Sequence, residues 1–162
     1  MSVCKIIDTC SLINLFDMLH CDVSVFFSRY QSVITDVVCL EYTQKYPRKV
    51  SDSISVVPMD DADGGLYEDL EYLFPNLGPG ERSAFAKAVF SIRHGEKAII
   101  ITDDIKAVRG FKRLCREKQF IGRYPEAESV VMVGSKDVLQ KMLDVGCISQ
   151  DEYTESCSLL NL

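Results

Sequence analysis

Two apolar runs far apart in the chain each end in aspartate, and this pattern constrains the fold more than any other feature. Val3–Ile7 is a short, β-rich run followed by Asp8. Residues 98–102 form a continuous apolar run followed by Asp103 and Asp104. Runs of this kind are typical of strands buried in a parallel sheet. Functional residues of open α/β sheets gather just beyond the carboxyl ends of the strands, so the sequence predicts a site there.

Helical and strand patterns alternate along the rest of the chain. Strands are predicted at residues 3–7, 32–35, 54–59, 98–102 and 130–133. Helices are predicted at residues 9–19, 23–30, 36–45 and 66–74, from the Gly78-Pro79-Gly80 segment to about His94, in the basic segment after Asp104, and at residues 135–144 and 149–160. Pro47 is expected to end the third helix, and the acids at residues 60–63 to cap the fourth. This alternation predicts an α/β sandwich with a mostly parallel central sheet. The length of 162 residues without an internal repeat predicts one domain over residues 1–162.

Two further acids occupy helix positions that are expected to face the core. Glu41 lies one helical turn after Val37 and Val38, and Glu81 shares a helix stripe with Phe85. A carboxylate at the edge of a core is costly unless something neutralises it. Several converging carboxylates raise one another's pKa unless a divalent cation lies among them. The acids therefore predict a metal site.

The expected cation is Mg²⁺ or Mn²⁺, because a site of carboxylates without His or Cys ligands suits these ions better than zinc. Such an ion activates water and offsets charge on a phosphodiester in the transition state. The two histidines lack a nucleophile motif around them, and no GxGxxG or GxxxxGK[ST] motif is present. A phosphatase site fails because Cys10 stands where a second acid is needed. These features predict a metal-dependent nuclease.

Three segments resemble the PIN domain family: IIDTCSLINL at residues 6–15, GPGERSA at residues 78–84 and IITDDIKAVR at residues 100–109. Together, in this order and at these separations, they are fairly specific, and the similarity covers nearly the whole chain. The resemblance implies a compact three-layer α/β/α fold with metal-dependent ribonuclease activity. Many members of this family are the toxins of bacterial and archaeal toxin-antitoxin pairs. An RNA substrate, an antitoxin partner with a basic side chain that reaches the carboxylates, and a homodimer are implied by the same resemblance.

By position, the resemblance also implies the site residues. The acids that would bind metal are Asp8, Glu81 and one or both of Asp103 and Asp104, with Glu41 as the second acid of the family. The polar residues that would position substrate or water are Thr9, Ser11 and Asn14. The Thr-Asp-Asp segment leaves the choice between Asp103 and Asp104 open, with a slight preference for Asp104. Each of the four segments carries its acid, which weighs against an inactive member of the family.

Each acid also has a simpler explanation when it is taken alone. Asp8, Asp103 and Asp104 could each cap a helix. Glu81 could complement a helix N-terminus, and Glu41 could pair with a buried arginine. The alternative function is accordingly a PIN-like module that binds RNA or a protein partner without cutting. The coincidence of four acidic segments favours the catalytic site.

The helix after Asp104 carries basic side chains although the formal net charge of the chain is −6. Its basic residues are Lys106, Arg109, Arg113 and Arg116 at spacings of three and four, with Lys112 and Lys118 beside them. A solvated helix face is the plain explanation of this row. A local RNA-binding patch beside the acids is the other.

Cysteine content and hydropathy bear on the cellular setting. The seven cysteines form no CxxC pair, and their odd number leaves at least one unpaired, which predicts a reducing, cytoplasmic environment. No apolar run approaches the roughly 20 residues that cross a bilayer, and no secretory signal pattern opens the chain. We therefore expect neither secretion by a standard signal nor a membrane span.

Overall fold

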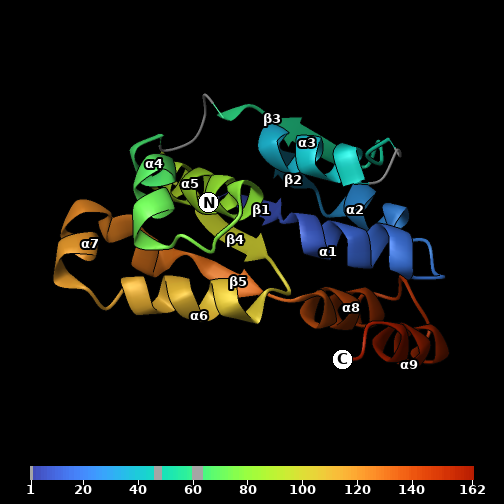
Figure 1. The fold of residues 1–162 in the computed structure, drawn as a ribbon. Helices are drawn as coiled ribbons and strands as arrows, with labels where there is room; N and C mark the ends of the chain where they lie inside the picture. The colour runs from blue at the N-terminus through green and yellow to red at the C-terminus, as the bar shows by residue number, and fades with distance from the viewer. Residues whose placement is uncertain (1, 46–48, 60–63) are drawn as a thin grey trace.

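The computed structural model describes residues 2–45, 49–59 and 64–162, which form a five-stranded sheet with helices on both faces (Figure 1). The strands are β1 (Val3–Ile7), β2 (Ser32–Thr35), β3 (Ile54–Val57), β4 (Lys97–Ile101) and β5 (Val131–Val133). They lie in the order β3-β2-β1-β4-β5, and every neighbouring pair is parallel. The predicted α/β sandwich with a parallel central sheet is confirmed.

Helical segments connect the strands. They are α1 (Thr9–Ile13), η1 (Asn14–Met18), α2 (Ser24–Arg29), α3 (Asp36–Lys45), α4 (Gly64–Leu73), α5 (Pro79–Arg93), α6 (Ile105–Leu114), α7 (Lys118–Arg123), η3 (Pro125–Ser129), α8 (Ser135–Asp144) and α9 (Gln150–Leu159). The helix predicted at residues 9–19 is α-helical only to Ile13 and continues as the wider π-helical turn η1. The predictions for Pro47 and for residues 60–63 lie outside the described residues.

Two apolar cores lie on opposite faces of the sheet, because successive residues of a strand point to opposite sides. Ile6 and Ile100 belong to the core beneath α4, α5, α6 and α7, in which the rings of Phe85 and Phe111 stack with centroids 3.9 Å apart. Ile7 and Ile101 belong to the core beneath α1, α2, α3 and α8. Figure 1 shows these two groups of helices on either side of the sheet, which gives the three layers.

The strand order reverses direction between β1 and β4. The chain leaves β1 through α1 and α2 toward β2, whereas it enters β4 from α5 on the other face. Such a reversal opens a crevice at the carboxyl ends of the two strands, where α/β proteins bind ligands. Ile7 pairs with Ile101, and the backbone N–H of Asp8 donates to the carbonyl of Ile101 at 3.0 Å. Asp8 and the residues after Ile101 therefore start side by side at this crevice.

The helices of the described segments are too short or too polar to span a bilayer. All seven cysteines are free thiols, and Cys4 and Cys157 lie against different cores. The two apolar cores and the hydrogen bonds therefore hold the fold without a disulfide.

Candidate active site

Asp8 is buried at the point where β1 passes into α1, with only 1% of its surface exposed. One carboxylate oxygen accepts a hydrogen bond from the backbone N–H of Ser11 at 2.8 Å, which caps α1. The other accepts a hydrogen bond from the hydroxyl of Thr102. Burial raises the pKa of Asp8 to about 6, and the negative charge of Asp103 adds to this effect. Asp8 is therefore both a helix cap and a carboxylate held at a cost in the crevice.

Glu81 and Asp104 bring their carboxyl groups together at the same crevice. Glu81 lies in the first turn of α5, where one of its oxygens accepts a hydrogen bond from the backbone N–H of Gly78 at 2.8 Å. Its carboxyl lies near that of Asp104. Burial raises the pKa of Glu81 to about 7, and both the proximity of Asp104 and the charge of Asp8 contribute. A divalent cation between such acids would offset their repulsion.

Asp104 has a second contact that fixes its position. Its carboxylate accepts a hydrogen bond from the backbone N–H of Ala107 at 3.0 Å and thereby caps α6. Its own backbone N–H donates to the hydroxyl oxygen of Thr102 at 3.2 Å. Thr102 thus connects Asp104 to Asp8, because the same hydroxyl donates to the Asp8 carboxylate. Asp8 and Glu81 also line one small recess in the protein surface.

The carboxylate of Asp103 has a different set of hydrogen-bond partners from that of Asp104. One of its oxygens accepts a hydrogen bond from the backbone N–H of Ser135 at 2.7 Å. The other accepts from the hydroxyl of Ser11 at 3.1 Å, from the side-chain amide of Asn14 at 2.8 Å and from the hydroxyl of Ser135. Four donors from three elements therefore surround this carboxylate and fix α8 against α1 and η1. This arrangement favours Asp104 over Asp103 as the acid that faces the crevice.

Glu41 joins α3 to the segments on both sides of it. Its carboxylate accepts a hydrogen bond from the hydroxyl of Thr9 at 2.7 Å and from the backbone N–H of Gly80 at 3.0 Å. A β-carbon on Gly80 would lie 2.4 Å from a Glu41 oxygen, so any larger residue here would displace the Glu41 carboxylate. Among the described residues, Glu41 forms no ion pair with an arginine, and Arg48 lies outside them. Glu41 adjoins the crevice as a neighbour that supports Thr9 and α5.

Cys10 lies next to the three carboxylates of the crevice and its side chain reaches the surface. Burial of the sulfur raises the pKa of this thiol to about 11, and the charges of Asp8, Glu81 and Asp104 act in the same direction. The raised pKa keeps this thiol protonated near neutral pH in the metal-free protein. The charged groups of the crevice are carboxylates.

The carboxylates of the crevice are hard oxygen donors, the kind of ligand that Mg²⁺ and Mn²⁺ prefer. Within residues 2–45, 49–59 and 64–162, no three or more His, Cys, Asp or Glu side chains are grouped closely enough to hold one ion as they stand. The paired carboxyls of Glu81 and Asp104, with Asp8 near enough to affect Glu81, still offer a set of hard oxygen donors. No lysine or arginine among the described residues forms an ion pair with any of these three acids. The residues therefore fit Mg²⁺ or Mn²⁺ in their chemistry.

No protein-family model, curated protein or solved structure matches this chain. The resemblance to the PIN domain family therefore rests on three sequence motifs alone.

The structure brings all the predicted site residues to the carboxyl end of the sheet, but it gives them different partners. Thr9, Ser11 and Asn14, which were expected to position water or substrate, each donate a hydrogen bond to a carboxylate. Thr102 and Ser135 were not among the candidates. The sequence could have indicated Thr102, since it precedes both aspartates in the same motif. It gave no indication of Ser135, because Ser135 lies 32 residues after Asp103 and approaches it only through the order of the strands.

Proposed function

We propose that this protein is a Mg²⁺- or Mn²⁺-dependent endoribonuclease with a PIN-like site. The observation that carries the proposal is that the carboxyls of Glu81 and Asp104 lie near each other, beside buried Asp8, where the strand order reverses. Bringing these acids together costs free energy of folding, because their charges repel and burial disfavours the ionised forms of Asp8 and Glu81. A function that needs a cation at this place accounts for the arrangement.

The residues have distinct roles under this proposal. Asp8, Glu81 and Asp104 would hold the metal ion, with Thr102 keeping Asp8 and Asp104 in place. The bound ion would supply a Lewis acid and lower the pKa of a bound water near the phosphodiester. Asp103 is a positioning residue that anchors α1 and α8 through its four donors. Glu41 positions Thr9 and the start of α5.

A second candidate function is a PIN-like module that binds RNA or a protein partner without cutting. It is favoured by one observation: Asp8 and Asp104 each cap a helix, so each has a structural reason to be present. A toxin role, an antitoxin partner and a homodimer are further proposals that rest on the family resemblance. The two candidate functions differ in whether the acids act on RNA chemistry.

The test is cleavage of a panel of single-stranded and structured RNAs with Mg²⁺, Mn²⁺ or EDTA. We expect metal-dependent cleavage by the wild type and a loss of about 100-fold or more in Asp8→Asn, the scale seen when one group that stabilises transition-state charge is removed. Asp151→Asn is the matched control, because Asp151 is exposed on α9 and contacts none of the site residues. Circular dichroism and thermal melting check that each variant is folded.

The outcomes separate the two candidates. Metal-dependent cleavage by folded Asp8→Asn at the wild-type rate would exclude the assigned site. No cleavage by the wild type, together with no stabilisation by Mn²⁺, would favour the binding module, since a ligand of the native state raises apparent stability.

A further inference from the structure

We propose that the groove between α6 and residues 74–77 binds the phosphate backbone of a single-stranded RNA and leads it to the carboxylates at Asp104. The inference rests on the proposed nuclease function for its direction, but the binding that it describes does not require catalysis. Its basis is the position of the groove, the unpaired charges along it and the aromatic residue in its wall.

The groove has a volume of about 610 Å³ and begins at the candidate active site. Asp104 lies among its lining residues, and the remaining length of the groove follows α6 away from the carboxylates. Phe74, Asn76 and Leu77 form the opposite wall. A strand that lies in this groove therefore has one end at the acids.

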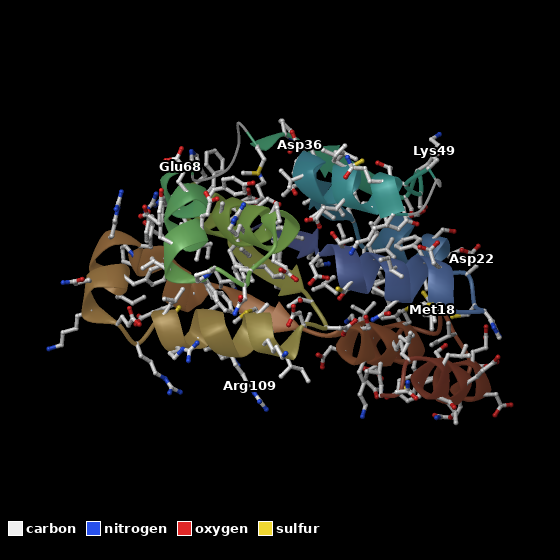
Figure 2. All side chains as sticks on the ribbon, viewed as in Figure 1. Met18, Asp22, Asp36, Lys49, Glu68 and Arg109 are labelled. Carbon is white, nitrogen blue, oxygen red and sulfur yellow. The ribbon has the colours of Figure 1, made fainter. Side chains whose placement is uncertain are left out.

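Five cationic side chains line this groove in a protein of net charge −6. They are Lys106, Arg109, Lys112, Arg113 and Arg116. None of the five has an ion pair among the residues that the structure describes, whereas Arg93 pairs with Glu126 and Arg123 with Asp69. Figure 2 shows Arg109 extending outward from α6.

The close spacing of these cations lowers the stability of the protein when no anionic partner is bound. Residues three and four apart on a helix are neighbours, so the charges of Lys106, Arg109 and Arg113 on α6 repel one another. A row of phosphates relieves this repulsion and releases the counterions of the nucleic acid. The solvated helix face remained a sufficient explanation from the sequence alone, but it accounts neither for the groove nor for its end at Asp104.

The aromatic wall favours RNA over an acidic peptide. Phe74 is half-buried against Gly110 and lines the groove, so its ring is available to a strand that lies there. A cationic groove with an aromatic side chain is the usual combination in proteins that bind single strands, because bases stack on the ring while phosphates meet the cations. An acidic peptide offers charge but no flat base for Phe74.

The test compares two variants with equal loss of charge. Arg109→Ala with Arg113→Ala removes two cations from the groove, and Arg29→Ala with Lys97→Ala removes two exposed cations elsewhere. The probe is a fluorescent oligouridylate of about 12 nucleotides, followed by anisotropy in EDTA so that no cleavage occurs. We expect the groove variant to bind on the order of ten-fold more weakly at about 0.1 M salt. The slope of log affinity against log salt should fall by about 1.4, since each single-strand contact contributes about 0.7.

The control variant should bind the probe like the wild type. Equal losses in both variants would overturn the proposal, because they would show an effect of net charge alone. Wild-type affinity in the groove variant, or no binding by the wild type, would overturn it as well. An oligoglutamate of equal charge that binds as tightly as the RNA, with the same loss in the groove variant, would assign the groove to an acidic peptide instead.

The same variants separate this proposal from the nuclease proposal. Weaker RNA binding by the groove variant than by the wild type supports the proposed RNA groove even if the wild type cleaves no RNA. Cleavage by the wild type, with unchanged binding and cleavage by the groove variant, would leave the nuclease in place and reject the groove.

Discussion

Asp103 and Asp104 are adjacent in sequence, yet their contacts predict opposite effects of the same substitution. Asp104→Asn keeps an oxygen that can cap α6, because asparagine caps helices as well as aspartate does. It also removes the repulsion between two acids at Glu81. We expect Asp104→Asn to retain or gain stability while RNA cleavage falls about 100-fold or more, as expected for loss of a charged group at the reaction centre. Thermal melting and the cleavage assay measure the two effects.

Asp103→Asn should instead lose stability. In asparagine an amide nitrogen replaces one of the two carboxylate oxygens. Either the side chains of Ser11, Asn14 and Ser135 or the backbone N–H of Ser135 would then lose its acceptor. Donors left without a partner in a partly buried place cost about 1 to 3 kcal/mol, which urea denaturation can resolve. Equal stability of Asp103→Asn and the wild type would show that this carboxylate does not anchor α1 and α8.

Sequence reasoning found Asp8, Glu81 and Asp104 because each follows a recognisable strand end or helix start. It could not tell capping from catalysis, and the structure shows the reason: Asp8 caps α1 and faces the crevice with the same carboxyl group. It also could not foresee that Thr9 and Asn14 are committed to Glu41 and Asp103, since those contacts span 32 and 89 residues. Long-range side-chain contacts have no local signal in the sequence.

At the scale of the element, Gly110 decides how closely α6 approaches the segment after α4. A β-carbon on Gly110 would lie 2.3 Å from the ring of Phe74, so Gly110→Ala must move the ring or the helix. We expect a net loss of stability of about 1 to 3 kcal/mol from overpacking, although alanine favours a helix by about 1 kcal/mol. Urea denaturation measures this change.

Gly122→Ala is the matched control for Gly110→Ala. It lies in α7, where an added β-carbon meets no atom within 4 Å, so the same substitution should raise stability by up to about 1 kcal/mol. Equal effects of the two substitutions would mean that Phe74 yields freely. The RNA affinity of Gly110→Ala then reports whether the shape of the groove matters.

Several elements were predicted within one residue of their observed limits. They are helices α3, α8 and α9 and strands β1, β2 and β4. The π-helical turn η1 was missed, because it contains neither proline nor glycine to interrupt the pattern that continues from α1. The short α7 and η3 were also missed, since Gly122 and Pro125 lie within a segment too short for a clear period.

At the scale of the whole molecule, strand order creates the site. The alternation of strands and helices predicted a parallel sheet, but it did not determine that β4 lies next to β1. That placement brings residues about 90 positions apart together, because Ile7 pairs with Ile101 and the chain turns into acids immediately after both. The same order places the start of α8 against Asp103. Sequence patterns are local, whereas the order of strands depends on packing of the entire chain.

The stability of the whole molecule should depend on pH through the buried acids. Burial raises the pKa of Asp8 from 3.8 to about 6 and that of Glu81 from 4.5 to about 7. The folded protein therefore holds protons that the unfolded chain has released between about pH 4 and pH 7, so stability falls as pH rises through this range. For Asp8 alone, the change in pKa from 3.8 to about 6 lowers the free energy of unfolding by about 3 kcal/mol above pH 6.

A divalent cation should offset this loss, because it binds the ionised carboxylates and competes with protons. At Mn²⁺ concentrations about 100-fold above its Kd, the gain at pH 8 is about 2.7 kcal/mol, which raises Tm by about 5 to 10 °C in a domain of this size. At pH 5 the gain should be much smaller, since the carboxyls of Asp8 and Glu81 are protonated in the folded protein. Glu81→Gln should be more stable than the wild type at pH 8 without metal and should respond less to Mn²⁺. A Tm increase by Mn²⁺ that is equal at pH 5 and pH 8, or unchanged in Glu81→Gln, would place the bound ion elsewhere on the protein.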